Sequence, residues 1–229
     1  ACLVGSEMCI RDSYEPGGEN RGKNGPMHLE EVAERFPVSD AFLRAAQEDG
    51  QPLNADYNSG DQEGVGYYQV LQHRGRRWSV VDGYMKPAAG RDNLKVECGA
   101  HVTRLLFEGK RCVGVAYRQN GQEHTVRARR ETVLCLGAVQ SPQLLELSGV
   151  GDPARLQSFN IPLVHAHAQV GENYIDHFAT RMNWRVKNAV TLNEMSRGWR
   201  LAQQVARYYT SHTGILTLGT GLVHGFVKS

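Results

Sequence analysis

The clearest hydrophobic pattern in the chain is a series of strand-length apolar runs between residues 94 and 136. Short polar segments with glycine or charged residues separate the runs, as expected of strands joined by tight turns. One turn is Asn120-Gly121, and these residue types favour the positive φ angles of a type I′ hairpin. Antiparallel pairing of the middle three runs follows, so we expect a three-stranded meander at roughly residues 102–129. The runs are residues 94–98, 102–107, 112–118, 124–129 and 132–136.

The run at 132–136 differs from the others because it is almost continuously apolar, which is typical of a strand covered on both faces. It leads into Gly137-Ala138 and then into an apolar helical run. Ser141 is a favoured N-cap, and Pro142 suits the first helical position. A strand, a glycine turn and a helix N-terminus can present backbone N–H groups to an anion. The pattern therefore favours either a phosphate-binding turn or an ordinary connection.

Elsewhere the pattern predicts two further helices that begin near serines. The first covers residues 40–49 after Ser39 and is followed by Gly50 as its C′ residue. The second begins near Ser196 and extends to about residue 211. A short helix is expected at 154–159, with strands at 67–71 and 161–165 and a glycine-rich loop at 54–66.

Composition narrows the class of protein. The chain has 229 residues and a net charge of +2, and 41% of its residues are apolar. These values favour one or two folded domains and give no electrostatic reason to expect nucleic acid or an anionic membrane. No apolar stretch approaches the roughly 18 residues of a membrane-spanning helix.

The cysteines and histidines suggest no metal site. The five cysteines are scattered without a CxxC pair, so Cys98, Cys112 and Cys135 are expected to be small buried residues in a reducing compartment. His165 and His167 would share one face of a strand, but no third ligand lies nearby. A hydrolase is also disfavoured, because the chain contains no GxSxG nucleophile elbow.

One segment is far more specific than a pair of glycines. GAVQSPQLLELSGVG at 137–151 resembles the second signature of the glucose–methanol–choline (GMC) flavoprotein oxidoreductases, and the choline dehydrogenase-like branch is the most similar. Other segments resemble the same family in the same order. They are EGVG at 63–66, RRWS at 76–79, GYMKPA at 83–88, VTRLLFEG at 102–109 and GENYIDH at 171–177.

The resemblance implies an α/β fold. We expect a partial FAD-binding domain of the glutathione-reductase-like type at residues 27–177, with the meander inside it, and the start of an α+β substrate domain at 178–229. Residues 1–26 are expected to be a disordered or non-native leader, since 2–13 resembles a translated sequencing-adapter tail. The family's GxGxxG fingerprint and its catalytic histidine have no counterpart here, so we expect an internal fragment that is inactive by itself.

The resemblance also implies FAD as cofactor and an alcohol as substrate, with hydride transfer to the flavin. Carried over by position, Val102 would contact the adenine through its backbone, and Gly137 and Ala138 would lie along the adenosine and pyrophosphate. No catalytic residue is assigned, and His177 is expected to have a structural role. The electron acceptor stays open, and the expected location is the cytoplasm, with peripheral membrane association left open. The alternative is a non-catalytic flavin-fold remnant that acts as a binding module.

Overall fold

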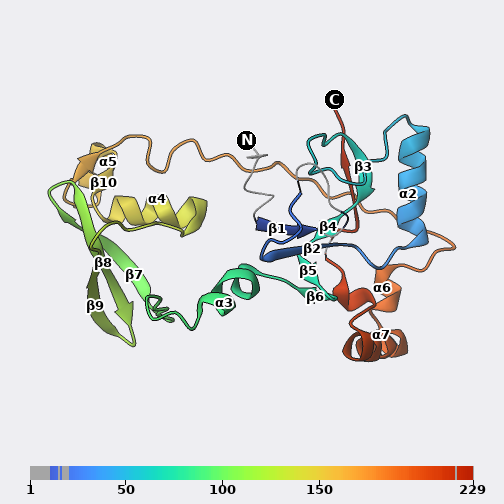
Figure 1. Ribbon diagram of the computed structural model, residues 1–229. Helices are drawn as coiled ribbons and strands as arrows, with labels where there is room; N and C mark the ends of the chain where they lie inside the picture. Colours follow the sequence, from blue (N-terminus) through green and yellow to red (C-terminus); the bar gives the residue numbers. More distant parts are fainter. Residues whose placement is uncertain (1–10, 15, 17–20, 220, 229) are drawn as a thin grey trace. The chain divides into compact units, whose positions relative to one another are not determined.

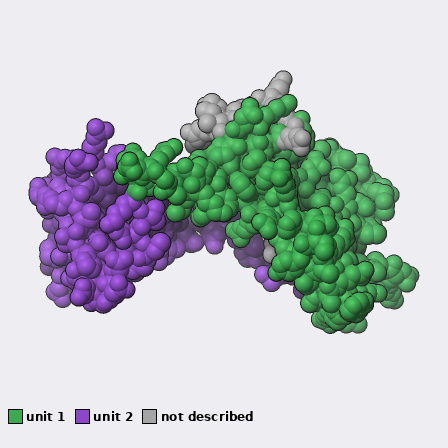
Figure 2. Space-filling model, turned by 60° about the horizontal axis from the view of Figure 1, so that its bottom comes forward, with its two compact units in different colours: residues 1–94, 184–229 green, residues 95–183 purple. Residues whose placement is uncertain are grey.

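The computed structural model describes residues 11–14, 16, 21–219 and 221–228 (Figure 1). The chain forms two compact units, which Figure 2 shows in different colours. Unit 1 comprises residues 1–94 and 184–229, and unit 2 comprises residues 95–183. These limits differ from the expected domain boundary at residue 178, which stays a prediction.

Unit 2 contains the expected antiparallel meander. Its strands are β7 (His101–Glu108), β8 (Arg111–Gln119) and β9 (Gln122–Arg127), in the sheet order β7-β8-β9 (Figure 1). Asn120 and Gly121 have φ angles of 51° and 80°, as a type I′ turn requires. This part of the prediction is confirmed.

The rest of unit 2 packs against the meander. Helix α4 (Gly137–Leu147) contacts β7. The short strands β10 (Val150–Gly151) and β11 (His165–Ala166) pair in parallel, and α5 (Pro153–Ser158) connects them along the chain. The predicted short helix is thus present. The strand expected at 161–165 overlaps the observed strand β11 only at residue 165. The buried apolar residues of unit 2 are Leu105, Val113, Ala116, Leu144 and Leu156.

Two other predicted strands of this region are wrong. Residues 94–98 and 132–136 have no strand structure, and Val133 is 72% exposed. A strand exists only through pairing, and no described strand lies hydrogen-bonded beside either run. Cys98 and Cys135, which lie in these runs, are exposed and Cys112 is half-buried, so the expectation of buried cysteines is also wrong.

Unit 1 combines short sheets with helices. Strand β2 (Met27–Glu31) lies between β1 (Asp12–Tyr14) and β4 (Gln69–Val70), and β3 (Gly64–Tyr67) pairs with the distant β12 (Val223–Phe226). The run expected at 67–71 is therefore divided between β3 and β4. The remaining elements are β5 (Gln72–His73), β6 (Arg76–Arg77), α2 (Pro37–Glu48), the π-helix η1 (Val81–Met85), α3 (Lys86–Ala88), α6 (Leu192–Met195), α7 (Gly198–Ser211) and the 3₁₀ helix η2 (Ile215–Thr217).

The helices begin within four residues of the predicted starts, but none of the three serines is an N-cap. The N-cap residues are Phe36, Leu136 and Arg197. In α2 the first helical position is taken by Pro37, whose fixed φ favours a helix start, and Ser39 is buried inside the helix. In α4 both Ser141 and Pro142 are internal, and Ser196 instead ends α6.

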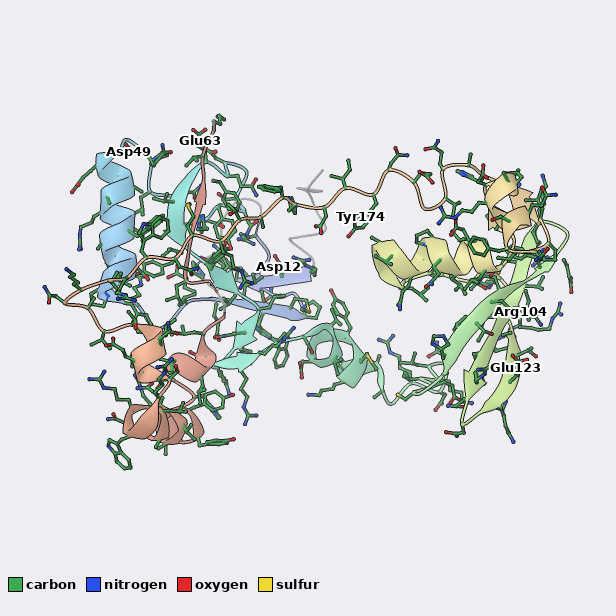
Figure 3. All side chains as sticks on the ribbon, turned by 180° about the vertical axis from the view of Figure 1, so that it is seen from behind. Asp12, Asp49, Glu63, Arg104, Glu123 and Tyr174 are labelled. Carbon is green, nitrogen blue, oxygen red and sulfur yellow. The ribbon has the colours of Figure 1, made fainter. Side chains whose placement is uncertain are left out.

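The expectation of disorder before residue 27 is wrong for the residues that the structure describes there. Strand β1 pairs in parallel with β2, and the Asp12 side chain is fully buried (labelled in Figure 3). Arg21 lies 3.4 Å from Asp12 and 2.7 Å from Asp56, and it also donates to Gln69. The non-native origin of residues 2–13 stays a prediction.

No helix among the described residues has the length and apolar character needed to cross a membrane.

Candidate cofactor-binding site

The start of β7 and one side of α4 form a hollow in unit 2 with a volume of about 540 Å³. Val102 lines it from β7, and Leu136 and Gln140 line it on either side of Gly137-Ala138. Gly137 and Ala138 do not line the hollow themselves, so their contact with a cofactor beside Val102 stays a prediction. The other lining residues are Ala100, His101, Thr103, Gln143, Leu144 and Leu147.

Val102 lies at an irregular point of the strand. It pairs with Tyr117, and the register then shifts before Arg104, so the ladder is interrupted at Thr103. Arg104 is exposed on β7 and Glu123 lies on β9 (both labelled in Figure 3). A bulge bends a strand and re-aims its side chains and backbone groups. The backbone at Thr103, next to Val102, therefore lacks a regular partner on β8. Backbone groups without such a partner can form contacts with a ligand.

Gly137 is the first residue of α4 and has a φ of 86°, a conformation that disfavours side chains. A Cβ built there would meet no atom within 4 Å, so the space beside it is open. No side chain caps the helix, and Ala138 is exposed. The first-turn N–H groups of α4 have no partner within the helix and can serve an anionic ligand.

The electrostatics of the hollow suit an anion. No carboxylate lines it, and His101 is its one titratable side chain. A negative group at the N-terminus of α4 would be stabilised by the helix dipole without repulsion from a neighbouring acid. The open glycine, the uncapped N–H groups and the apolar start of β7 together fit the adenosine and pyrophosphate part of FAD.

The other glycines of the signature have structural roles. Gly149 has a φ of 88°, and a Cβ there would overlap the carbonyl oxygen of Pro162. At Gly151 a Cβ would lie 3.2 Å from the Glu146 side chain. Both glycines allow the chain after α4 to pack closely on its neighbours, away from the hollow.

Ser148 has a role that was missed in the sequence. Its Oγ accepts a hydrogen bond from the backbone N–H of Leu105 at 2.8 Å and donates to the carbonyl of Leu144 at 2.6 Å. The bond fastens the C-terminal end of α4 to β7 and so sets the distance between the two walls of the hollow. The Ser-Gly pair is visible in the signature, but the sequence does not indicate that Ser148 bonds to a strand 43 residues earlier.

The histidines considered in the sequence lie apart from the hollow. His165 and His167 are exposed with ring centroids 6.4 Å apart, and no group of three metal ligands occurs among the described residues. His177 is also exposed, and its backbone N–H donates to Asp176 at 2.8 Å. Its proposed structural role stays a prediction.

Comparison with known proteins bears on the family of the chain. The family described as GMC oxidoreductase matches residues 5–179. Mouse choline dehydrogenase is 38% identical over 91% of this chain, and an alcohol dehydrogenase [acceptor] from Pseudomonas putida is 36% identical over 91%. The chain covers 35% and 38% of the lengths of these two relatives, so it corresponds to about a third of each.

Solved structures agree with the fold. Pyridoxine 4-oxidase from Mesorbium loti superposes with a TM-score of 0.66 at 30% identity, over 70% of this chain and 32% of that one. Formate oxidase from Aspergillus oryzae gives a TM-score of 0.80 at 23% identity, over 97% of this chain and 40% of that one. The expected α/β flavoenzyme fold is confirmed.

Proposed function

The chain belongs to the GMC oxidoreductase family, and on this premise we propose that it is part of an FAD-dependent enzyme that oxidises an alcohol to an aldehyde or a ketone. FAD is the cofactor of this family, as expected from the sequence.

The observation that carries the proposal is the hollow that Val102 lines together with Leu136 and Gln140, which lie on either side of the first residues of α4. In it the backbone near Val102 would contact the adenine. The N–H groups of Gly137 and Ala138 would donate to the pyrophosphate, and Ser148 would hold the helix at its working distance from β7. When bound, FAD supplies the acceptor for a hydride from the alcohol carbon.

The relatives support an alcohol as substrate. Their printed names include choline dehydrogenases from mouse and human and an alcohol dehydrogenase [acceptor]. Removal of the hydroxyl proton needs a base within hydrogen-bond reach of the substrate. None of the described residues of this chain is assigned that task.

A direct test uses the purified intact protein that contains this chain. Primary and secondary alcohols, choline among them, are added without oxygen, and the visible absorbance of the flavin is followed. We expect one of these alcohols to bleach the absorbance. A protein that binds FAD but is bleached by none of them would instead support the non-catalytic binding module.

A further inference from the structure

His224 is buried in the middle of the strand pair that joins the two segments of unit 1. It is 4% exposed and lies opposite Gly66 in the antiparallel pairing of β12 with β3. A Cβ on Gly66 would lie 3.1 Å from the Nε2 atom of His224 and closer still to the carbonyl oxygen of Asn54. The imidazole therefore rests directly on a glycine of the neighbouring strand.

Three aromatic rings surround this imidazole, and we call them the aromatic box. The centroids of Tyr57, Phe226 and Tyr68 lie 4.1, 5.2 and 5.4 Å from that of His224. Neither ring nitrogen of His224 has a hydrogen-bond partner among the described residues. A buried polar group in this state is costly and uncommon.

The groups that face His224 offer no counter-ion. From the loop before β3 and from the residue after it come the phenol groups of Tyr57 and Tyr68, and the Tyr57 oxygen accepts the N–H of Gln69 at 3.3 Å. Burial raises the pKa of Tyr57, so this phenol stays neutral. The ion pair of Glu63 with Lys228 lies at the end of the strand pair, beyond Phe226.

We propose that neutral His224 acts as a pH-sensitive latch, which keeps β12 paired with β3 near neutral pH and releases it when the imidazole takes up a proton. An imidazolium in the aromatic box would lose its hydration without gaining a carboxylate. Opening of the strand pair restores water to the ring. The pairing of residues 64–67 with residues 223–226 would thus depend on pH.

The direction of the effect follows from linkage. Burial lowers the pKa of His224 below its ordinary value of 6.5. The opened state then binds more protons than the closed state at pH values below 6.5, so the closed state is fully stable above 6.5 and loses stability on acidification. Between the two pKa values, the equilibrium constant for opening rises about tenfold per pH unit.

The test is a proton titration of His224 in the intact protein by NMR of ¹³C-labelled histidine, together with hydrogen exchange of residues 223–226. We expect a pKa below 6.5 for His224. We also expect exchange at 223–226, corrected for the intrinsic pH dependence, to speed up between pH 6.5 and 5.5, while the meander strand at 111–119 serves as reference. In His224→Phe this acceleration should be lost, and in the control His167→Phe, which changes an exposed histidine outside the meander, it should remain.

Two results would overturn the proposal. A pKa of 6.5 or above would show that the rings stabilise the imidazolium through cation–π contacts. Equal acid-induced exchange in wild type and His224→Phe would show that another group causes the opening. Because the titration needs only wild-type protein, it decides the question even if His224→Phe does not fold.

Discussion

Ser148 accepts the backbone N–H of Leu105 at 2.8 Å and so links the end of the signature helix α4 to the middle of strand β7. The same hydroxyl donates to Leu144 in the last turn of α4. One side chain thereby satisfies a carbonyl at the helix end and an N–H of the strand. This joint fixes the two elements that form the candidate cofactor site.

Removal of the joint should destabilise unit 2. Ser148→Ala leaves the N–H of Leu105 without its partner, and we expect a loss of about 1–3 kcal/mol in the free energy of unfolding. The measurement is chemical denaturation of the intact protein. Ser158→Ala is the control, because its Oγ donates to a carbonyl at the exposed end of α5, and it should cost less than about 1 kcal/mol. Equal losses in the two variants would contradict the assigned role of Ser148.

The buried ion cluster around Arg21 should be critical for unit 1. Arg21→Ala would remove the buried guanidinium that pairs with both Asp12 and Asp56 and would leave Asp12 with Arg11 as its counter-charge. Loss of a partner from a buried ion pair costs up to about 3–5 kcal/mol. Lys95→Ala, which breaks an exposed ion pair with Glu97, should cost at most about 1 kcal/mol. The thermal midpoints of both variants test this difference. A midpoint of Arg21→Ala near that of wild type would show that β1 does not contribute to the fold.

The phenol of Tyr67 should ionise at a higher pH than that of an ordinary tyrosine. Burial and a hydrogen bond of 2.6 Å to the carboxylate of Asp40 raise its pKa to about 12. Since the ordinary pKa is about 10, the bond's contribution to stability is complete below pH 10 and is lost as the pH rises toward 12. Absorbance of tyrosinate near 295 nm, compared with Asp40→Asn, gives the test. We expect one tyrosine to ionise at lower pH in the variant, and identical titration curves would contradict this.

The sequence was informative where folding depends on local signals. The meander was predicted because Asn120-Gly121 specifies a tight turn between the two strands that it joins. The N-caps were misplaced because Pro37 and Gly137 begin their helices through backbone conformation, without the hydroxyl groups that the pattern pointed to.

The failures have a non-local cause. An apolar run such as residues 132–136 carries the composition of a strand, but strand formation depends on partners that the run itself does not encode. The same holds for the joint at Ser148, whose partner lies 43 positions earlier, and for the burial of Asp12 by Arg21 and β2. Val102 and Gly137 were proposed as cofactor contacts only through the resemblance to the family, since spacing alone left the glycine turn undecided.

The most direct test of the account is the FAD content of purified intact protein with Gly137→Val, compared with Gly121→Val. Both glycines have φ angles of 80° or more and open space at the Cβ position, so the backbone strain is matched, but Gly121 lies in a hairpin turn away from the hollow. We predict that Gly137→Val loses most of its flavin absorbance per protein, because the valine fills the space beside the α4 N-terminus. Gly121→Val should keep the flavin absorbance per protein of the wild type. Equal flavin content in the two variants would contradict the proposed cofactor site.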